Sequence, residues 1–263
     1  MSPSAAAEAR ARAREDVVRR IVGAGRRQLA EVGAAGLSLR AVARELGMVS
    51  SAVYRYVATR DELLTHLIVE TYDALGEAAE RADAACAPED AAARWRAVCR
   101  GTRAWALAHP HEFALVHGSP VPGYAAPVET VRPAGRAPAV MGRLLREAVS
   151  AGVVDPAAVR PLPAGTPASL RADLRALAAQ PVFGLLPADG GAVEGEDALV
   201  ALVAHGLAAW QQVTGAVVLE LDGALTNVVG DRAAWFDVLV DGWLDVLLPG
   251  AGNSRPGARE DSV

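Results

Sequence analysis

The chain has 263 residues, of which 52% are hydrophobic, so it can bury a large core and lacks the composition of a disordered chain. Its formal net charge of −5 excludes a uniformly basic, nucleic-acid-binding surface. The N-terminus has no basic and apolar leader and no apolar run approaches the roughly 20 residues that span a bilayer, so we expect a soluble cytoplasmic protein of one or two domains.

The charge is unevenly distributed along the chain. Residues 1–60 carry eleven arginines and five acidic residues, a net charge of +6, whereas the remainder carries 15 arginines and 26 acids, a net charge of −11. A basic N-terminal part on an acidic body is typical of a localised phosphate-binding surface. The two cysteines, Cys86 and Cys99, are expected to be ordinary reduced residues and not a disulfide or a metal pair.

Residues 1–13 are rich in Ala, Ser and Arg and are expected to form a flexible arm or a fraying extension of the first helix. Arg10, Arg12 and Arg14 could contact the DNA backbone or minor groove there, or be solvated. Apolar periodicity over residues 14–32 predicts an amphipathic helix that packs behind the elements that follow.

The segment 37–64 predicts two short helices joined by a tight turn, with a third helix directly after them. The first helix presents one apolar face at i, i+3, i+4 and i+7: Leu39, Val42, Ala43 and Leu46. The hydroxyl of Ser38 is expected to cap this helix, and Gly47 to end it in the left-handed conformation. The second helix should begin near Ser50, and Thr59 should open the third with a capping box.

Two short helices around a glycine-containing turn are typical of a helix-turn-helix, which places its second helix in the DNA major groove. An ordinary helical hairpin within a bundle is the alternative. Small residues after the turn would allow close approach to base edges, and Tyr and Arg side chains would reach phosphates. Alternatively, Tyr54 could pack partly into the core formed by these N-terminal helices, and Tyr56 could cover the turn. The candidate DNA contacts are Ser38, Leu39, Arg40, Val49, Ser50, Ser51, Ala52, Tyr54, Arg55, Tyr56 and Arg60.

Residues 15–70 resemble the DNA-binding region of the tetracycline-repressor (TetR) family of bacterial regulators. The matching residues are Gly36, Ser38, Ala43, Leu46, Gly47, Val53, Tyr54, Tyr56, Arg60, Leu63 and Leu64. Val57 stands where a Phe is common in the family, and Arg60 where a Lys is common. In the resembled family an Arg at the place of Arg40 can reach a guanine edge, and a phosphate contact is the alternative.

The resemblance implies an all-α fold with a three-helix head at residues 14–60, a ligand-binding and dimerisation body at 61–250 and a polar tail at 251–263. It implies a ligand-responsive regulator that binds a palindromic operator in double-stranded DNA as a homodimer. Repression is expected in preference to activation. A helical small-molecule-binding protein without a DNA role is the rival function, and the basic head argues against it.

Helical periodicity continues over residues 59–85, 88–109 and 111–117. The sequence AWALAHPHEFALVHGSPVPGY, residues 104–124, resembles the body of one branch of the family, in which the tryptophan-bearing helix borders the effector cavity. Aromatic walls with a few polar groups describe small-molecule sites, and they also describe an ordinary core. The candidate effector-binding residues are Trp105, His109, Phe113, His117, Trp210 and Gln211, which favour a hydrophobic or aromatic effector.

Eleven of the sixteen prolines lie in residues 119–190, where helices are expected only at 139–151 and 168–179 and irregular loop elsewhere. Two apolar helices follow at 196–221 and 233–248, the second with Asp231 as its cap. Their small residues suggest packing across a two-fold axis, and a monomer core is the alternative. The predicted seam residues are Gly206, Ala209, Val213, Phe236, Val240 and Trp243.

No catalytic or metal-binding motif is recognisable. His109, His111 and His117 lie near Glu112, but they form no HExxH pair, and neither a Gly-x-Ser-x-Gly elbow nor a glycine-rich phosphate loop is present. We therefore expect no enzyme activity, no cofactor and no metal. The expected partners are an operator, a small-molecule effector and a second copy of the chain, with no membrane.

Overall fold

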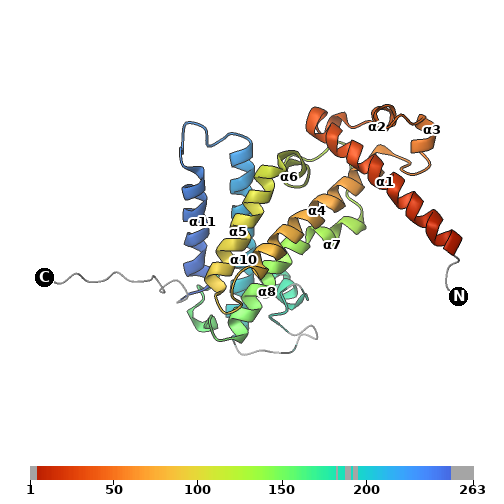
Figure 1. The fold of residues 1–263 in the computed structure, drawn as a ribbon. Helices are drawn as coiled ribbons and strands as arrows, with labels where there is room; N and C mark the ends of the chain where they lie inside the picture. Colours follow the sequence, from red (N-terminus) through yellow and green to blue (C-terminus); the bar gives the residue numbers. More distant parts are fainter. Residues whose placement is uncertain (1–4, 182, 187–190, 192–194, 250–263) are drawn as a thin grey trace. The chain divides into compact units, whose positions relative to one another are not determined.

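The structure is a computed structural model that describes residues 5–181, 183–186, 191 and 195–249, so the tail expected at 251–263 lies outside the described residues. Every regular element in the described residues is a helix, which confirms the all-α prediction (Figure 1). The α-helices are α1 (Ala5–Val32), α2 (Leu39–Glu45), α3 (Ser50–Val53), α4 (Arg60–Ala84), α5 (Ala91–Ala108), α6 (Pro110–His117), α7 (Val131–Ala134), α8 (Arg136–Ser150), α9 (Ala168–Ala179), α10 (Glu196–Leu221) and α11 (Arg232–Leu247). Single 3₁₀ turns lie at Ala34–Gly36, Val128–Thr130 and Pro156–Ala158.

The chain divides into two compact units. The first, which we call the head unit, comprises Met1–Ala74 and Ala108–Ala134, and the second, the body unit, comprises Leu75–Leu107 and Gly135–Val263. The helix α4 contributes its first part to the head unit and its last part to the body unit. The head unit thus includes α6 and α7 in addition to the three N-terminal helices; the domain boundaries expected at residues 60 and 250 stay a prediction.

The head unit has its own hydrophobic core, made by α1, α2, α3 and the start of α4. Its fully buried members recur at helical spacing, as the sequence predicted: Ile21, Val22, Leu29, Val42, Ala43, Val53, Leu63, Leu64 and Leu67. Leu115, Val121 and Tyr124 pack against this core from α6 and the loop that follows. The helix-turn-helix therefore rests on α6 as well as on α1 and α4.

Two helices of the head have boundaries that the sequence left open. α1 begins at Ala5, so residues 5–13 take the second of the two expected forms, an extension of the first helix. α3 is only four residues long, Ser50–Val53, and residues 54–56 form a turn.

The predicted caps are partly confirmed. Thr59 Oγ1 accepts from the Glu62 N–H at 3.0 Å, and the Glu62 carboxylate accepts from Ala58 N–H at 2.6 Å, one residue before the expected capping-box donor. Asp231 caps α11 by accepting from Ala234 N–H at 2.9 Å. Ser38 precedes α2 but makes no side-chain cap; its own N–H donates to Gln28 Oε1 at 3.2 Å.

The body unit is built around α5, α8, α10 and α11. Trp95 of α5 is fully buried. Its indole N–H donates to the Val240 carbonyl of α11 at 2.9 Å, so the one polar atom of the ring is hydrogen-bonded within the core. Cys99 is also fully buried, and burial raises the pKa of its thiol, which keeps it protonated and unreactive.

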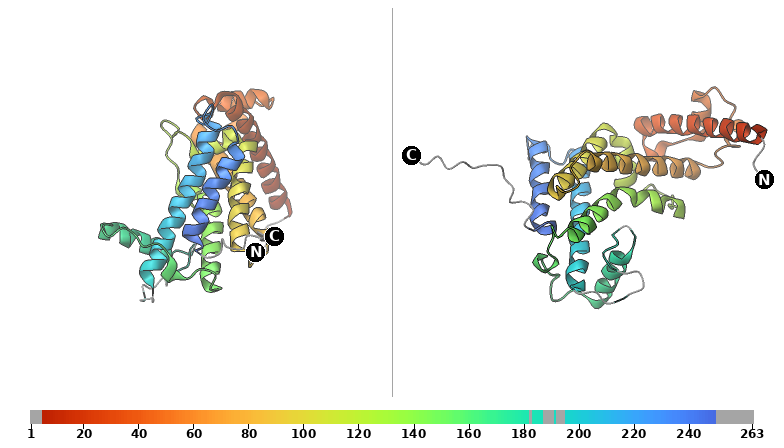
Figure 2. Two further views of the ribbon diagram at one scale, coloured as in Figure 1. Left: turned by 90° about the vertical axis from the view of Figure 1, so that its left-hand side faces the viewer. Right: turned by 60° about the horizontal axis from the view of Figure 1, so that its bottom comes forward.

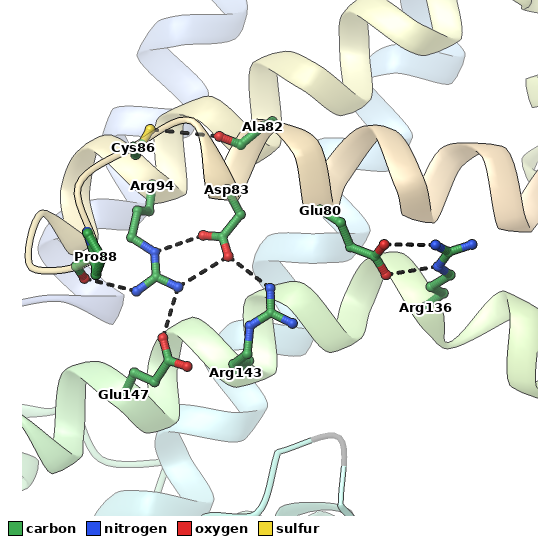
Figure 3. A network of polar contacts seen from close by, with 9 residues as sticks. All are labelled: Glu80, Ala82, Asp83, Cys86, Pro88, Arg94, Arg136, Arg143 and Glu147. Carbon is green, nitrogen blue, oxygen red and sulfur yellow. Dashed lines mark hydrogen bonds and ion pairs between the residues drawn. The ribbon is translucent and has the colours of Figure 1, made fainter.

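An ionic network joins the C-terminal end of α4 to α5 and α8 (Figure 3). Asp83 accepts from Arg94 Nε at 2.8 Å and Nη2 at 3.2 Å, and from Arg143 Nη2 at 2.8 Å. Arg94 also donates to the Pro88 carbonyl at 3.0 Å and pairs with Glu147 at 2.9 Å. Asp83 and Arg94 are each only about 6% exposed, yet their charges balance and their polar atoms are satisfied.

A second ion pair fixes the same helix one turn earlier. Glu80 accepts two bonds of 2.8 Å from Arg136, which lowers the pKa of the Glu80 carboxyl (Figure 3). The aliphatic stem of Arg136 lies so close to Gly76 that a Cβ there would stand 2.5 Å from it. Glycine at this position lets α8 approach α4 closely enough to form the pair.

Part of the proline-rich region outside its predicted helices is irregular, as expected, but it also packs into a core. Leu174, Ala178, Phe183 and Leu186 form a small core with Leu199, Val200 and Val203 of α10. The predicted helices themselves are confirmed as α8 and α9.

The helix α10 is more apolar than the sequence analysis predicted. By length and composition alone it could cross a membrane, because an 18-residue window has a mean hydropathy of 1.3. Of the residues in that window, 33% are buried inside the protein. In the body unit α10 lies beside α11 and α9 and supplies buried residues to the core (Figures 1 and 2). Thus α10 is a core helix that also exposes apolar side chains.

Candidate nucleic-acid interface

The turn between α2 and α3 is closed by backbone hydrogen bonds around Gly47. Its φ of 64° lies in the left-handed region, as predicted, and its N–H donates to the Arg44 carbonyl at 3.2 Å. The next N–H, of Met48, donates to the Ala43 carbonyl at 2.9 Å. These bonds satisfy the last carbonyls of α2 and let α3 begin only a few residues later.

The two short helices bury one face and expose the other. Val42, Ala43 and Val53 are at most 1% exposed and hold the helices on α1. The opposite face carries predicted DNA contacts, and the exposed ones are Arg40, Val49, Ser50, Ser51, Tyr54 and Arg55. Tyr54 is 43% exposed and Val49 71%, so Tyr54 is not a core residue of the head.

Three predicted contacts are less accessible than expected. Leu39 is 4% exposed and belongs to the head core, which corrects its assignment as a side chain available to DNA. Ser38 and Ala52 are half-buried. The apolar i, i+3, i+4 pattern predicts that Leu39 lies on the buried face of α2, and the structure agrees with this pattern. Its position in the chain next to Arg40 does not make it accessible.

Arg60 has a structural role that the sequence did not indicate. Its Nη2 donates to the carbonyls of Ala34 and Ala35, at 2.8 and 3.4 Å, and its Nη1 lies 3.7 Å from Asp61. The side chain thereby holds the 3₁₀ turn after α1 against the start of α4. A phosphate contact by Arg60 stays a prediction, because a guanidinium has further donors.

Tyr56 is half-buried and packs partly against the head core. The guanidinium carbon of Arg14 lies 5.4 Å from the centre of its ring, a cation–π distance. Arg14 Nη1 also donates to the Arg55 carbonyl at 3.3 Å. Arg14 thus joins α1 to the end of α3. The only sequence signal for this role is that Arg14 stands four and seven residues before Val18 and Ile21, which places it on the same side of the helix as these two apolar residues.

The arginines of the head separate by their partners. Arg12, Arg19, Arg26, Arg27 and Arg60 each lie within ion-pair distance of a carboxylate. Across the described part of the chain, no carboxylate pairs with the following head arginines: Arg14, Arg20, Arg40, Arg44 and Arg55. Exposed guanidinium groups without a carboxylate partner are suited to bind phosphate oxygens.

A groove of about 480 Å³ runs along the outer face of α1, at the end of α2. Its lining residues are Asp16, Arg19, Arg20, Gly23, Arg27 and Leu46. Arg19 pairs with Asp16 at 3.1 Å and Arg27 with Glu45 at 2.5 Å, so most of the charge in the groove is neutralised locally.

The candidate effector residues fall in both units. Phe113 and His117 lie together in the head unit, with ring centres 4.6 Å apart, and Tyr72 of α4 is 6.1 Å from the His117 ring. Trp105 and Trp210 are half-buried members of the body unit. His109 and Gln211 are exposed, which removes them from an enclosed apolar site.

Burial affects the titration of the candidate effector residue His117. Burial lowers the pKa of its imidazole, and a hydrogen bond to the backbone of Val116 opposes this shift only in part. Its Nε2 is buried and has no hydrogen-bond partner among the described residues. Tyr72, which was not among the candidate site residues, donates to the Val116 carbonyl at 3.3 Å and so holds α6 against α4.

The predicted dimer seam is largely wrong. Gly206, Ala209, Val213, Phe236 and Val240 are buried in the core of a single protomer, and only Trp243 stays half-exposed. Arg96 and Arg100 of α5 pair with Asp241 and Asp237 at 2.7 and 2.8 Å, which fixes that side of α11 on α5. Both helices also expose large apolar side chains, which are Leu207 and Leu219 of α10 and Trp235 and Val238 of α11.

Two family models match the chain. One, described as bacterial regulatory proteins of the tetR family, matches residues 21–67, and the other, described as a tetracyclin repressor-like C-terminal domain, matches residues 95–243. The first covers the helix-turn-helix and the second covers more than half of the chain.

Similar proteins carry related descriptions. The helix-turn-helix-type transcriptional regulators Rv1816 of Mycobacterium tuberculosis and Mb1846 of Mycobacterium bovis are each 50% identical to this chain over 145 residues, 54% of the chain. The match spans 59% of the length of these relatives. The crystal structure of SCO4313, described as a regulatory protein, aligns with a TM-score of 0.66 at 30% identity, over 89% of this chain and 97% of that one. A protein of unknown function from Rhodococcus sp. RHA1 shares the fold, with a TM-score of 0.57 at 23% identity over 85% and 93% of the two chains.

Proposed function

The chain belongs to the tetracycline-repressor family of bacterial regulators, and from this premise we propose that it controls transcription by binding an operator in double-stranded DNA as a dimer. Family membership makes it a regulator and not an enzyme. The observation that carries the DNA role is the exposed face of α2 and α3, where no carboxylate of the described residues pairs with Arg40, Arg44 or Arg55. Such groups supply the phosphate contacts that dominate DNA affinity.

The proposed binding mode places α3 in the major groove. Ser50 and Ser51 begin this helix, are exposed and are small enough for the backbone to approach base edges. Arg40, at the second position of α2, is proposed to form a bidentate contact with a guanine. A symmetric dimer would read a palindrome with half-site centres about 34–36 Å apart, or a multiple of this distance.

In-vitro selection from a random duplex library tests this proposal. We expect enrichment of an inverted repeat, and we expect Arg40→Ala to relax base preference at one position of each half-site, at a cost of about 1–3 kcal/mol for the preferred base. Arg44→Ala is the matched control, because Arg44 lies one turn further along α2 and should weaken all sequences alike. If the wild type enriches no sequence, the rival function, small-molecule binding without a DNA role, becomes the better one.

We further propose that the regulator is a cytoplasmic repressor released by a small hydrophobic or aromatic effector. Arg26 of α1 links the helices through which an effector could act on the head. It bonds Glu70 of α4 at 2.5 Å and lies 3.7 Å from Glu112 of α6. A change at α6 therefore acts on α1 and α4 together. The effector must favour one of two head arrangements for the switch to operate.

Intrinsic fluorescence tests the effector class, because all five tryptophans lie between residues 95 and 243. Phenols, aromatic acids and medium-chain fatty acids serve as probes. We expect saturable quenching by at least one class, with release of the selected DNA at the same concentration. Quenching that Trp105→Phe and Trp210→Phe both leave unchanged, with release intact, would place the effector elsewhere.

A further inference from the structure

The first part of α1 extends beyond the segment that the family model matches. The match begins at residue 21, whereas the helix begins at Ala5. These residues, 5–20, which we call the α1 extension, rise about 24 Å along the helix axis at about 1.5 Å per residue. Within the head unit they project past α2 and α3 (Figures 1 and 2).

The α1 extension is exposed toward its N-terminal end. Every residue from Ala7 to Asp16 is exposed, and the first buried residue among the described residues of the helix is Ile21. A helix of this length is only marginally stable by itself in water. The side chains of residues 7–16 are therefore accessible to another molecule.

Charge on the α1 extension is separated by face. At about 100° per residue, Ala7, Arg10, Ala11 and Arg14 fall on one side of the helix, in line with Ile21. The three acids of the extension all fall on the opposite side, with two arginines that pair with them: Glu8, Arg12, Glu15, Asp16 and Arg19. Over residues 7–14 the first side carries basic and small residues only, and Val17 and Val18 follow it toward the head core.

Arg14 shows which way that basic side points. Its guanidinium stacks on Tyr56 and donates to the Arg55 carbonyl, so the side that bears Arg10 and Arg14 faces the end of α3. Arg55 and Tyr54 beside it are exposed and belong to the proposed DNA face. The basic side of the α1 extension is thus a continuation of that face.

We propose that the basic side of the α1 extension, Ala7, Arg10, Ala11 and Arg14, binds backbone phosphates of the DNA outside each half-site. This inference rests on the proposed operator binding and extends it to the flanks. Ala7 lies about 10 Å beyond Arg14 along the helix, which corresponds to about three base pairs at 3.4 Å per nucleotide. The two alanines leave room for the backbone to approach, and the two arginines supply the charge.

The experiment compares two duplexes that share the selected operator. One ends at the outer edges of the half-sites, and the other continues for six base pairs of unrelated sequence on each side. We measure affinity by fluorescence anisotropy at 50 and 200 mM salt for the wild type and for full-length Arg10→Ala, Arg14→Ala and Arg12→Ala. Arg12 is the matched control, because it lies between the two on the acidic side of the same helix.

We expect the wild type to bind the long duplex at least about threefold more tightly than the short one at 50 mM salt, with a steeper salt dependence. Arg10→Ala should reduce this advantage and lower the salt slope on the long duplex by about one unit per protomer, with little effect on the short duplex. Arg14→Ala should reduce the advantage as well. Arg12→Ala should retain it.

Three results would overturn the inference. Equal wild-type affinity for both duplexes would show that the flanks are not contacted. Equal losses in Arg10→Ala and Arg12→Ala would reduce the effect to net charge, and equal loss on both duplexes in Arg10→Ala and Arg14→Ala would give the two arginines a role inside the head only. In each case operator binding itself would persist, whereas absence of binding to either duplex would instead overturn the proposed function.

Discussion

The guanidinium of Arg60 bonds two carbonyls that close the turn after α1, so its removal should affect stability before it affects DNA. We expect Arg60→Ala to lower the free energy of unfolding by about 1–3 kcal/mol, because the Ala34 carbonyl loses its charged donor in a part-buried site. Urea denaturation measures this effect. Arg40→Ala is the control and should unfold like the wild type, since the Arg40 side chain is exposed.

The opposite result is equally informative. If Arg60→Ala unfolds like the wild type while the salt slope of operator binding falls by about one unit, the phosphate contact expected from the sequence holds. A local pattern could not have shown the present partners, because Ala34 and Ala35 lie more than twenty residues before Arg60 and meet it only in the folded head.

His117 should make stability depend on pH. Burial lowers its pKa from the ordinary 6.5, so between that value and its folded value the unfolded chain binds more protons than the folded one. The free energy of unfolding should therefore be highest above pH 6.5 and decrease as the pH falls below it. We expect His117→Leu to lack this decrease between pH 7 and 5, as measured by urea denaturation at fixed ionic strength. An identical pH profile in both proteins would refute the assignment.

At the scale of elements, the last turns of α4 depend on Asp83. Asp83→Asn removes the charge that compensates Arg94, which is 6% exposed, and a broken buried pair costs about 3–5 kcal/mol. We expect a decrease of about 10 °C in Tm by calorimetry. Glu77→Gln on the same helix is the control, because the Glu77 side chain is 58% exposed and its pair with Arg81 should contribute less than about 1 kcal/mol.

Acid should abolish the difference between Asp83→Asn and the wild type. Burial alone would raise the pKa of Asp83, but the hydrogen bonds and charges of Arg94 and Arg143 outweigh it and lower the pKa below the ordinary 3.8. A depressed carboxyl pKa stabilises the fold above the unfolded value, and this contribution is lost as the pH falls through the folded value. We expect the two proteins to converge below about pH 4; a constant gap down to pH 2 would contradict the role given to the charge.

Helix positions could be predicted from the sequence because they follow local periodicity. The limits of α10 agree with the expected 196–221, and the left-handed Gly47 and the caps at Thr59 and Asp231 follow from residue type. The same reasoning located Arg40 and Arg55 on the exposed face of the head.

The direction in which an apolar helix faces could not be predicted in the same way. α10 is apolar on most sides, so spacing alone does not distinguish a side that meets α8 from one that meets a second protomer. Gly206 illustrates this, because a Cβ there would lie 3.1 Å from the Leu145 side chain of the same chain. Likewise, Phe183 and Leu186 lie in a segment whose sequence reads as loop, yet they complete a small core between α9 and α10.

At the scale of the whole molecule, the exposed apolar residues of α10 and α11 are the better candidates for the dimer seam. Leu219, Trp235 and Val238 are 51%, 40% and 60% exposed. Gly242 shares the exposed side of α11 with Trp235 and Val238 at about 100° per residue, and a Cβ at Gly215 or Gly242 would meet nothing within 4 Å among the described residues. Glycines on an exposed apolar face let a second pair of helices approach closely, and a symmetric dimer would cover the same patch on both copies.

We expect a dimer of about 54 kDa in solution, twice the 27.2 kDa of the chain, and we expect Val238→Glu to convert it to a monomer that keeps its helicity. The substitution places two like charges near the two-fold axis without disturbing the core, whereas Val213→Glu would bury a charge at a site that is 1% exposed and should unfold the body. Leu170→Glu on α9, at 47% exposure, is the control and should stay dimeric. Because a single head contacts only a few base pairs, and two linked heads gain affinity by effective concentration, the Val238→Glu monomer should lose operator affinity by about 100-fold or more. Light scattering measures the oligomeric state, and fluorescence anisotropy measures operator affinity on the same samples. A monomeric variant that still binds the operator tightly would mean that one head suffices.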